Sequence, residues 1–133
     1  MNYATNFSYL IFLLALTIFS CQSNAQKGID LSPAEFKTTM EKESNAIILD
    51  VRTPKEVAQG VIPGAMVINF YDADFKSQIE KLDKNKTYFV YCKGGGRSSK
   101  ACSALQEGGF PKAYNLKGGI TAWKKEGLTT TKE

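Results

Sequence analysis

The sequence contains no histidine in 133 residues. The missing imidazole excludes Ser-His-Asp and Cys-His catalysis, as well as metal sites built from histidine. The three cysteines, at positions 21, 92 and 102, lack the C-x-x-C spacing of zinc and redox motifs. We therefore predict no metal and no cofactor, and a reactive cysteine here must be activated by local dipoles and cations.

Arginine is also scarce, because it occurs only at positions 52 and 97, and the lysines are scattered. A chain without an aromatic-basic stripe is not predicted to bind nucleic acid. The 17 Lys and Arg against 13 Asp and Glu give a net charge of +4. Two interpretations of this charge remain, namely solubility alone or the steering of a small anion toward a site.

A glycine-rich segment, Cys92–Ser98 (CKGGGRS), lies between a β-branched and aromatic run and a helix-forming run. Successive glycines let the backbone N–H groups turn inward, and the following helix adds the positive end of its dipole. Such a loop favours an anion and should lower the pKa of the Cys92 thiol. The alternative, a buried structural cysteine, does not require three glycines and an arginine beside it.

The loop has the form C-x-x-G-x-R and resembles the active-site loop of single-domain rhodanese-like sulfurtransferases. Further segments resemble motifs of that family in the same order. They are D-V-R-x-x-x-E at Asp50–Glu56, G-V-I-P-G-A at 60–65, and L-x-G-G-x-x-x-W at Leu116–Trp123. Val61 stands where the family often has histidine. The resemblance extends over residues 29–128.

The resemblance implies an α/β, rhodanese-like fold and the transfer of sulfane sulfur from a donor such as thiosulfate or a persulfide to a thiophilic acceptor. Cys92 would be the catalytic nucleophile and would carry the sulfur as a persulfide. The residues expected to bind substrate are Lys93, Gly94, Gly95, Gly96, Arg97 and Ser98. The expected supporting polar network consists of Asp50, Arg52 and Glu56. Arg97 would either contact substrate or brace the loop against Asp50 or Glu56.

The expected partners are a small anionic sulfur donor and a thiol or cyanide-like acceptor, which includes protein thiols. The protein is expected to be a monomer. One alternative function is a sulfur carrier or peptide-binding module without turnover. A cysteine phosphatase is a second alternative, but such enzymes use C-x5-R, and here the sixth position after Cys92 is Ser98.

Hydrophobic patterning predicts alternating strands and helices. Apolar strands are expected at 46–49, 66–68, 88–91 and 113–116, and helices at 32–42, 53–60, 73–82, 98–107 and 120–126. This alternation predicts an open parallel sheet of about five strands with helices on both faces. Ligands bind at the carboxyl ends of such strands, where Cys92 and the Asp50–Arg52 segment would emerge. Cys102 is predicted to be a core residue, with a resolving thiol as the alternative. Gly118, Gly119 and Trp123 are predicted to be turn and packing elements, with Trp123 as a wall of the pocket as the alternative.

The N-terminus differs from the rest of the chain. The apolar run Tyr9–Phe19 has the length of a signal-peptide core and is too short to span a bilayer. Ile18–Cys21 resembles a bacterial lipobox, although Phe19 is bulky for its position and residues 1–6 carry no Lys or Arg. Alternatives are a plain secretory signal cut elsewhere, which would leave a secreted periplasmic protein, an uncleaved anchor, and a buried helix.

The predicted organisation is therefore a lipoprotein-type signal peptide at 1–20, a lipidated Cys21 with a polar tether at 21–28, the domain at 29–128 and a tail at 129–133. Lipidation of Cys21 would anchor the domain in the bacterial cell envelope, in the periplasm or at the outer membrane.

Overall fold

Five parallel strands form one sheet in the order β1-β5-β4-β2-β3. The computed structural model describes residues 28–132. The predicted signal peptide, Cys21 and the tether up to residue 27 lie outside the described residues. The strands are β1 (Ile29–Leu31), β2 (Ala46–Asp50), β3 (Met66–Val67), β4 (Thr87–Tyr91) and β5 (Ala113–Leu116). The predicted α/β fold with its parallel sheet is confirmed.

The edge strand β1 is the one strand that the hydrophobic pattern did not predict. It has three residues with Asp30 at the centre, and it follows a polar segment. Its formation depends on pairing with β5, where Asp30 lies opposite Asn115. A segment this short has little periodicity of its own, so a distant partner decides its conformation.

The helices are α1 (Pro33–Lys42), α2 (Pro54–Val57), α3 (Phe75–Glu80), α4 (Gly96–Glu107) and α5 (Gly119–Lys125). All five were predicted, but α2 and α3 are shorter than expected and α4 begins two residues earlier. The first two helices begin with a capping box and a proline in the first turn. In these boxes Ser32 pairs with Glu35, and Thr53 pairs with Glu56, so that side chains satisfy the free N–H groups of the first turn.

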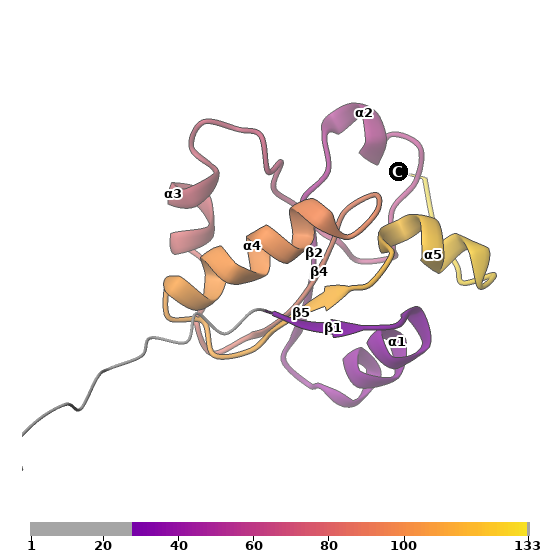
Figure 1. The fold of residues 1–133 in the computed structure, drawn as a ribbon, viewed down its shortest axis with the longest axis horizontal. Coiled ribbons are helices and arrows are strands. Elements are labelled where there is room, and N and C mark those ends of the chain that lie inside the picture. Colours follow the sequence, from indigo (N-terminus) through magenta and orange to yellow (C-terminus); the bar gives the residue numbers. More distant parts are fainter. Residues whose placement is uncertain (1–27, 133) are drawn as a thin grey trace, which may run out of the picture.

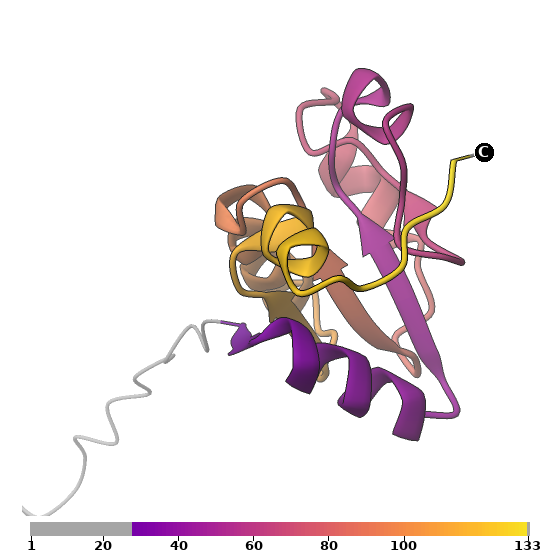
Figure 2. The ribbon, with the colours of Figure 1, turned by 90° about the vertical axis from the view of Figure 1, so that its right-hand side faces the viewer.

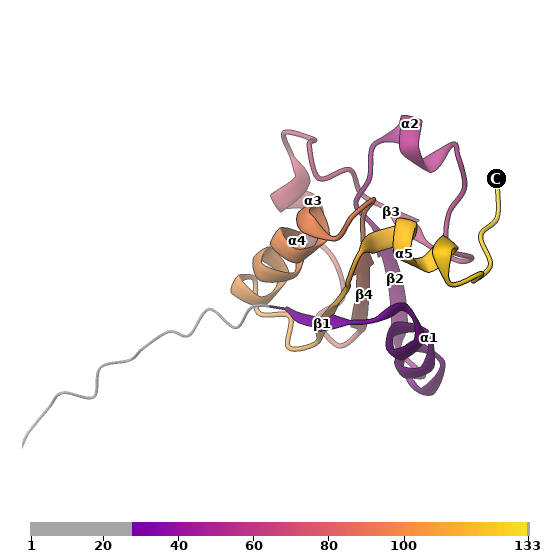
Figure 3. The same cartoon turned by 45° about the vertical axis from the view of Figure 1, so that its right-hand side comes forward.

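Two apolar layers cover the sheet, one on each face (Figures 1 and 3). Helices α3 and α4 pack on one face through residues such as Ile79 and Leu105. Helices α1 and α5 cover the other face through Phe36 and Trp123, whose rings meet edge to face. Cys102 is fully buried in the α4 layer, which confirms it as a core residue. All five residues of the central strand β4 are buried.

The carboxyl ends of the strands point toward α2 and the C-terminal segment (Figure 2). Residues 129–132 of the predicted tail lie against the domain, because Val61 and Thr131 exchange backbone hydrogen bonds of 2.8 and 2.9 Å. The indole N–H of Trp123 donates to the carbonyl of Thr129 at 2.9 Å. Across residues 28–132, no helix combines the length and the apolar character needed to cross a membrane.

Candidate active site

Cys92 lies between the end of β4 at Tyr91 and the start of α4 at Gly96. Its Sγ atom accepts a hydrogen bond from the backbone N–H of Gly95 at 3.1 Å and another from the hydroxyl of Ser98 at 3.3 Å. Only 1% of Cys92 is exposed. The strand therefore delivers the sulfur into a cup formed by the loop and the first turn of α4.

The cup favours the thiolate form of Cys92. Burial alone would raise the pKa of this thiol, but hydrogen bonds from the Ser98 hydroxyl and from the N–H groups of Ser98, Gly95 and Gly94 outweigh burial and lower the pKa. Hydrogen bonds to the charged form stabilise it, and a thiolate is the nucleophilic form of cysteine. In this chain, which contains no histidine, hydrogen bonds from the loop and from Ser98 therefore favour the thiolate.

Gly95 sets the shape of the loop. Its φ is +100°, in the region that residues with a Cβ rarely adopt. A Cβ at this position would lie 3.2 Å from the Gly118 nitrogen and 3.3 Å from the Leu116 oxygen. The loop therefore lies close to the backbone of the turn that follows β5.

The first residues of α5 hold the other side of the loop. The N–H of Ile120 donates to the Cys92 carbonyl at 2.9 Å, and that of Thr121 donates to the Lys93 carbonyl at 3.2 Å. Gly119, with φ +60°, sits so close that a Cβ would lie 2.3 Å from the Lys93 oxygen. The Gly-Gly pair, predicted as a turn element, thus also positions the segment that carries Cys92.

Asn115 is a second positioning residue, and its role was not predicted from the sequence. Its buried side-chain NH₂ donates to the Gly95 carbonyl at 3.3 Å and to a carboxylate oxygen of Asp30 at 2.8 Å. Asn115 thereby links the edge strand β1 to the loop that carries Cys92. The available signal was a polar side chain inside an otherwise apolar strand, Ala113–Leu116.

Arg97 forms a two-point ion pair with Glu56. The two terminal nitrogens of Arg97 lie 2.8 and 2.7 Å from the two carboxylate oxygens. The same carboxylate accepts from the backbone and hydroxyl of Thr53 in the capping box of α2, at 3.0 and 2.9 Å. Of the two roles expected for Arg97, this geometry is that of bracing, and the partner is Glu56.

The ion pair fixes both charges. The hydrogen bond from Arg97 is the main reason that the pKa of Glu56 falls to about 2, with further contributions from Thr53. The same bond to Glu56 raises the pKa of Arg97. The guanidinium also lies 5.4 Å from the centre of the Tyr71 ring, in cation–π geometry.

Asp50 and Arg52 form a separate, buried ion pair beneath the loop. Arg52 donates to both carboxylate oxygens of Asp50 at 2.6 to 3.0 Å. Its remaining N–H groups reach the carbonyls of Gly60 at 2.8 Å and Glu56 at 3.2 Å. The predicted network is thus two carboxylate–arginine pairs that are joined through the backbone of α2.

The other loop residues differ in their exposure. Lys93, Gly94 and Gly96 are exposed, whereas Gly95 and Ser98 are buried beside the sulfur.

Burial raises the pKa of the Cys102 thiol to about 12, with smaller contributions from Asp30 and Cys92, so this second cysteine is a poor nucleophile. In the described part of the chain, no group of three or more Cys, Asp and Glu side chains could hold a metal ion.

Replacing Ser98 with alanine should raise the pKa of the Cys92 thiol, because the thiolate loses its side-chain donor. Activity that requires the thiolate should then begin to rise at a higher pH. At neutral pH, kcat/KM should fall about tenfold, the scale of one hydrogen bond to a charged group. Thiolate absorbance and kcat/KM against pH would measure both effects, with Ser99→Ala as the neighbouring control. Coincident pH profiles for wild type and Ser98→Ala would show that Ser98 does not stabilise the thiolate.

Fold and site together define an α/β protein in which a buried cysteine with a lowered pKa lies in a glycine-rich loop at the carboxyl end of the sheet. Residues 32–126 match the model of the rhodanese-like domain family. The chain is 39% identical over 97 residues to the putative sulfurtransferase YtwF of Bacillus subtilis, a match that covers 73% of this chain and 91% of that protein. The chain therefore belongs to the rhodanese-like family of sulfurtransferases.

Two further similarities describe the range of this family. A crystal structure of a rhodanese-related protein from Thermoplasma volcanium superposes with a TM-score of 0.69 at 27% identity, covering 79% of this chain and 99% of that chain. The tRNA uridine(34) hydroxylase of Cytophaga hutchinsonii is 40% identical over 96 residues, a match that covers 70% of this chain and 30% of that protein. Similar domains thus occur alone and within longer proteins.

Proposed function

We propose that the protein transfers sulfane sulfur through a persulfide on Cys92. The observation that carries the proposal is the direct hydrogen bonding of the sulfur by Gly95 and Ser98, which lowers the pKa of the thiol in a chain without histidine. Sulfur transfer needs a stabilised thiolate and an anionic leaving group. It needs no base to take a proton from water or an alcohol.

The reaction proceeds in two displacements. With thiosulfate as donor, the Cys92 thiolate attacks the outer sulfur and forms a new S–S bond, while the S–S bond of the donor breaks and sulfite leaves with the electron pair. The persulfide anion occupies the cup, where N–H groups of the loop and the Ser98 hydroxyl stabilise it. An acceptor thiolate or cyanide then attacks the outer sulfur, and the Cys92 thiolate is regenerated.

A sulfur carrier without turnover is the second candidate, because a similar domain also occurs as one segment of a longer protein that is named as a hydroxylase and not as a sulfurtransferase. A carrier needs the same persulfide, so the two functions differ only in the rate of the second step. A phosphatase is disfavoured, because Arg97 follows Cys92 after four residues and pairs with Glu56.

The intact mass of the purified protein, measured before and after incubation with thiosulfate, should increase by one sulfur atom. Cyanide or a thiol acceptor should then remove that sulfur, and thiocyanate or acceptor persulfide should form in repeated turnovers. A single turnover with every acceptor would support the carrier. Absence of the sulfur adduct with both thiosulfate and persulfide donors would contradict both candidates, and phosphate release from a phosphate ester would support the phosphatase.

We further propose that the domain is tethered to an envelope membrane through lipidated Cys21. The support is the apolar run Tyr9–Phe19, which ends two residues before this cysteine. In fractionated cells fed labelled fatty acid, the wild type should be labelled and bound to membrane, and Cys21→Ala should be unlabelled. Unlabelled wild type in the cytosol that retains residues 1–20 would contradict the proposal. Unlabelled protein in the periplasm would support a plain secretory signal instead.

A further inference from the structure

Both arginines of the chain are already neutralised by carboxylates. Arg52 is paired with Asp50 beneath the loop, and Arg97 is paired with Glu56 at its edge. The formal charge of the two pairs is zero. Together with an ionised Cys92, these four residues therefore carry a net charge of −1. The attraction for a donor then comes from peptide N–H groups and from the exposed Lys93, which forms no ion pair within residues 28–132.

This arrangement penalises a donor with charge −2. Thiosulfate is such a dianion, and it must approach the Cys92 thiolate, which lies near enough to Arg97 of the Arg97–Glu56 pair to interact with its charge. Because Coulomb energy scales with the product of the charges, a donor with charge −1 meets half of that repulsion. The low pKa of Glu56, about 2, keeps its carboxylate charged throughout the neutral range.

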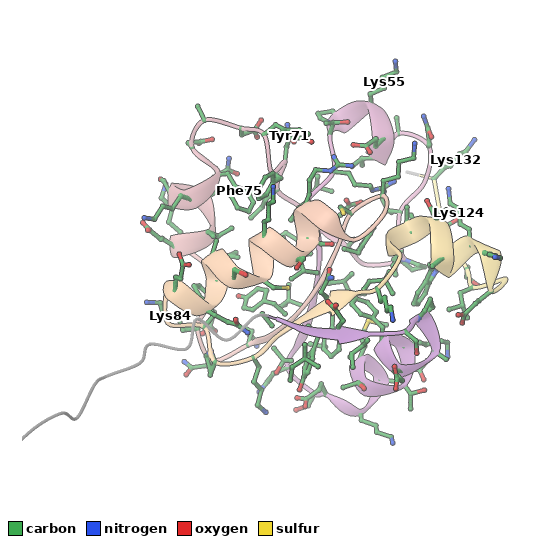
Figure 4. The ribbon with its side chains drawn as sticks, in the orientation of Figure 1. Lys55, Tyr71, Phe75, Lys84, Lys124 and Lys132 are labelled. Carbon is green, nitrogen blue, oxygen red and sulfur yellow. The ribbon has the colours of Figure 1, made fainter. Side chains whose placement is uncertain are left out.

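Tyr71 adds an apolar surface beside the same ion pair. Its side chain is 66% exposed, which is unusual for a large aromatic residue, and its ring faces the Arg97 guanidinium at 5.4 Å. In Figure 4, Tyr71 lies between α2 and α3, near the N-terminal end of α4, whereas Lys55 of α2 points outward into solvent. An exposed ring at this place offers a contact to the organic part of a donor, which thiosulfate lacks.

We propose that Glu56, Arg97 and Tyr71 make this site selective for a sulfane-sulfur donor that carries an organic group and at most one negative charge at its reacting end, such as the persulfide of a small thiol. The proposal rests on the sulfurtransferase function proposed above. The Cys92 thiolate attacks the outer sulfur of R–S–SH and forms the S–S bond of the Cys92 persulfide. The S–S bond of the donor breaks, the leaving R–S⁻ takes the electron pair and then the proton to become R–SH, and the Cys92 persulfide anion remains in the cup.

Three stable donors separate the effect of charge from that of the organic group. Thiosulfate carries charge −2, methanethiosulfonate carries charge −1 with a methyl group, and benzenethiosulfonate carries charge −1 with a phenyl ring. For each donor, kcat/KM is measured with one saturating acceptor in wild type and variants. Differences in intrinsic leaving-group reactivity cancel when each variant is compared with wild type on the same donor.

Glu56→Gln should increase kcat/KM for thiosulfate, relative to methanethiosulfonate, by about fivefold, the scale expected for removing one charge from a partly exposed ion pair. Glutamine keeps an oxygen for the α2 capping box, and circular dichroism checks that the fold is retained. Glu107→Gln makes the same change in net charge at the far end of α4, about 16 Å along the helix from Gly96, and should leave the ratio unchanged.

Tyr71→Ala should reduce kcat/KM for benzenethiosulfonate, relative to methanethiosulfonate, by about fivefold, as expected for the loss of one aromatic contact, and Tyr71→Phe should restore it. The comparison of Tyr71→Ala with wild type decides the outcome even if Glu56→Gln does not fold, because Tyr71 is exposed and its replacement should leave the core intact. If the ratios of kcat/KM between donors were the same as in wild type in both folded Glu56→Gln and Tyr71→Ala, the inference would be overturned. Sulfur transfer in wild type would still support the proposed function. No transfer from any donor in wild type would overturn the proposed function itself.

Discussion

Replacing Cys92 with serine should lower the rate of sulfur transfer by at least about a thousandfold, as removal of a catalytic nucleophile does in other enzymes. A serine hydroxyl is not ionised at neutral pH, and the chain has no histidine to remove its proton. The donors that stabilise a thiolate, Gly95 and Ser98, would therefore face a neutral oxygen. Turnover and the mass of the thiosulfate-treated protein should both show this loss.

The matched control is Cys102→Ala, because the same chain holds a second thiol in a different environment. Cys102 is fully buried, and its pKa is raised to about 12, chiefly by that burial, so it should neither accept sulfur nor contribute to turnover. Alanine avoids the unpaired hydroxyl that serine would bury in the core. Wild-type transfer by Cys92→Ser, or loss of the sulfur adduct in Cys102→Ala alone, would place the nucleophile elsewhere.

The parts of the site predicted from sequence are those encoded by a continuous segment. The loop from Cys92 to Ser98 contains its own signals, since glycines permit the turn and a helix follows. The capping residues Ser32 and Thr53 likewise act on neighbours three positions along the chain. Such signals can be read from one stretch of sequence without knowledge of the tertiary structure.

The parts that could not be predicted depend on contacts between distant segments. Arg97 pairs with Glu56, which lies 41 positions earlier in the sequence, and not with Asp50. Asp50 instead pairs with Arg52. The strand β1 and the hydrogen bond from Asn115 to Gly95 arise only once the sheet has formed. A local pattern carries no information on which of two similar carboxylates will be nearer in the fold.

The close approach of Gly119 to the active loop leads to the second large effect. A Cβ on this residue would lie 2.3 Å from the Lys93 oxygen, 2.4 Å from the Lys93 carbonyl carbon and 2.6 Å from the Cys92 oxygen. These are backbone atoms, which cannot rotate out of the way as a side chain can. Gly119→Ala must therefore displace either the start of α5 or the segment that carries Cys92.

Gly119→Ala should reduce kcat/KM by about a hundredfold, because a shift of about 1 Å in a reacting group can have an effect of that size. The displaced loop should also weaken the hydrogen bonds to the Cys92 sulfur, so the pKa of the thiol should rise toward its ordinary value. Alanine at φ +60° strains the folded backbone and should lower the free energy of unfolding by about 1–2 kcal/mol. Steady-state kinetics, thiolate absorbance against pH and urea unfolding would measure the three effects.

Gly127→Ala separates the effect of the clash from that of the backbone conformation. Gly127 follows α5 with φ +74°, and apart from its two chain neighbours no residue has an atom within 4 Å of the position that its Cβ would take. Both variants should therefore lose stability through the left-handed conformation, but only Gly119→Ala should lose activity and thiolate character. Equal and small losses of activity in the two variants would mean that α5 does not position Cys92. Equal and large losses would mean that general destabilisation, rather than contact with the loop, explains the effect.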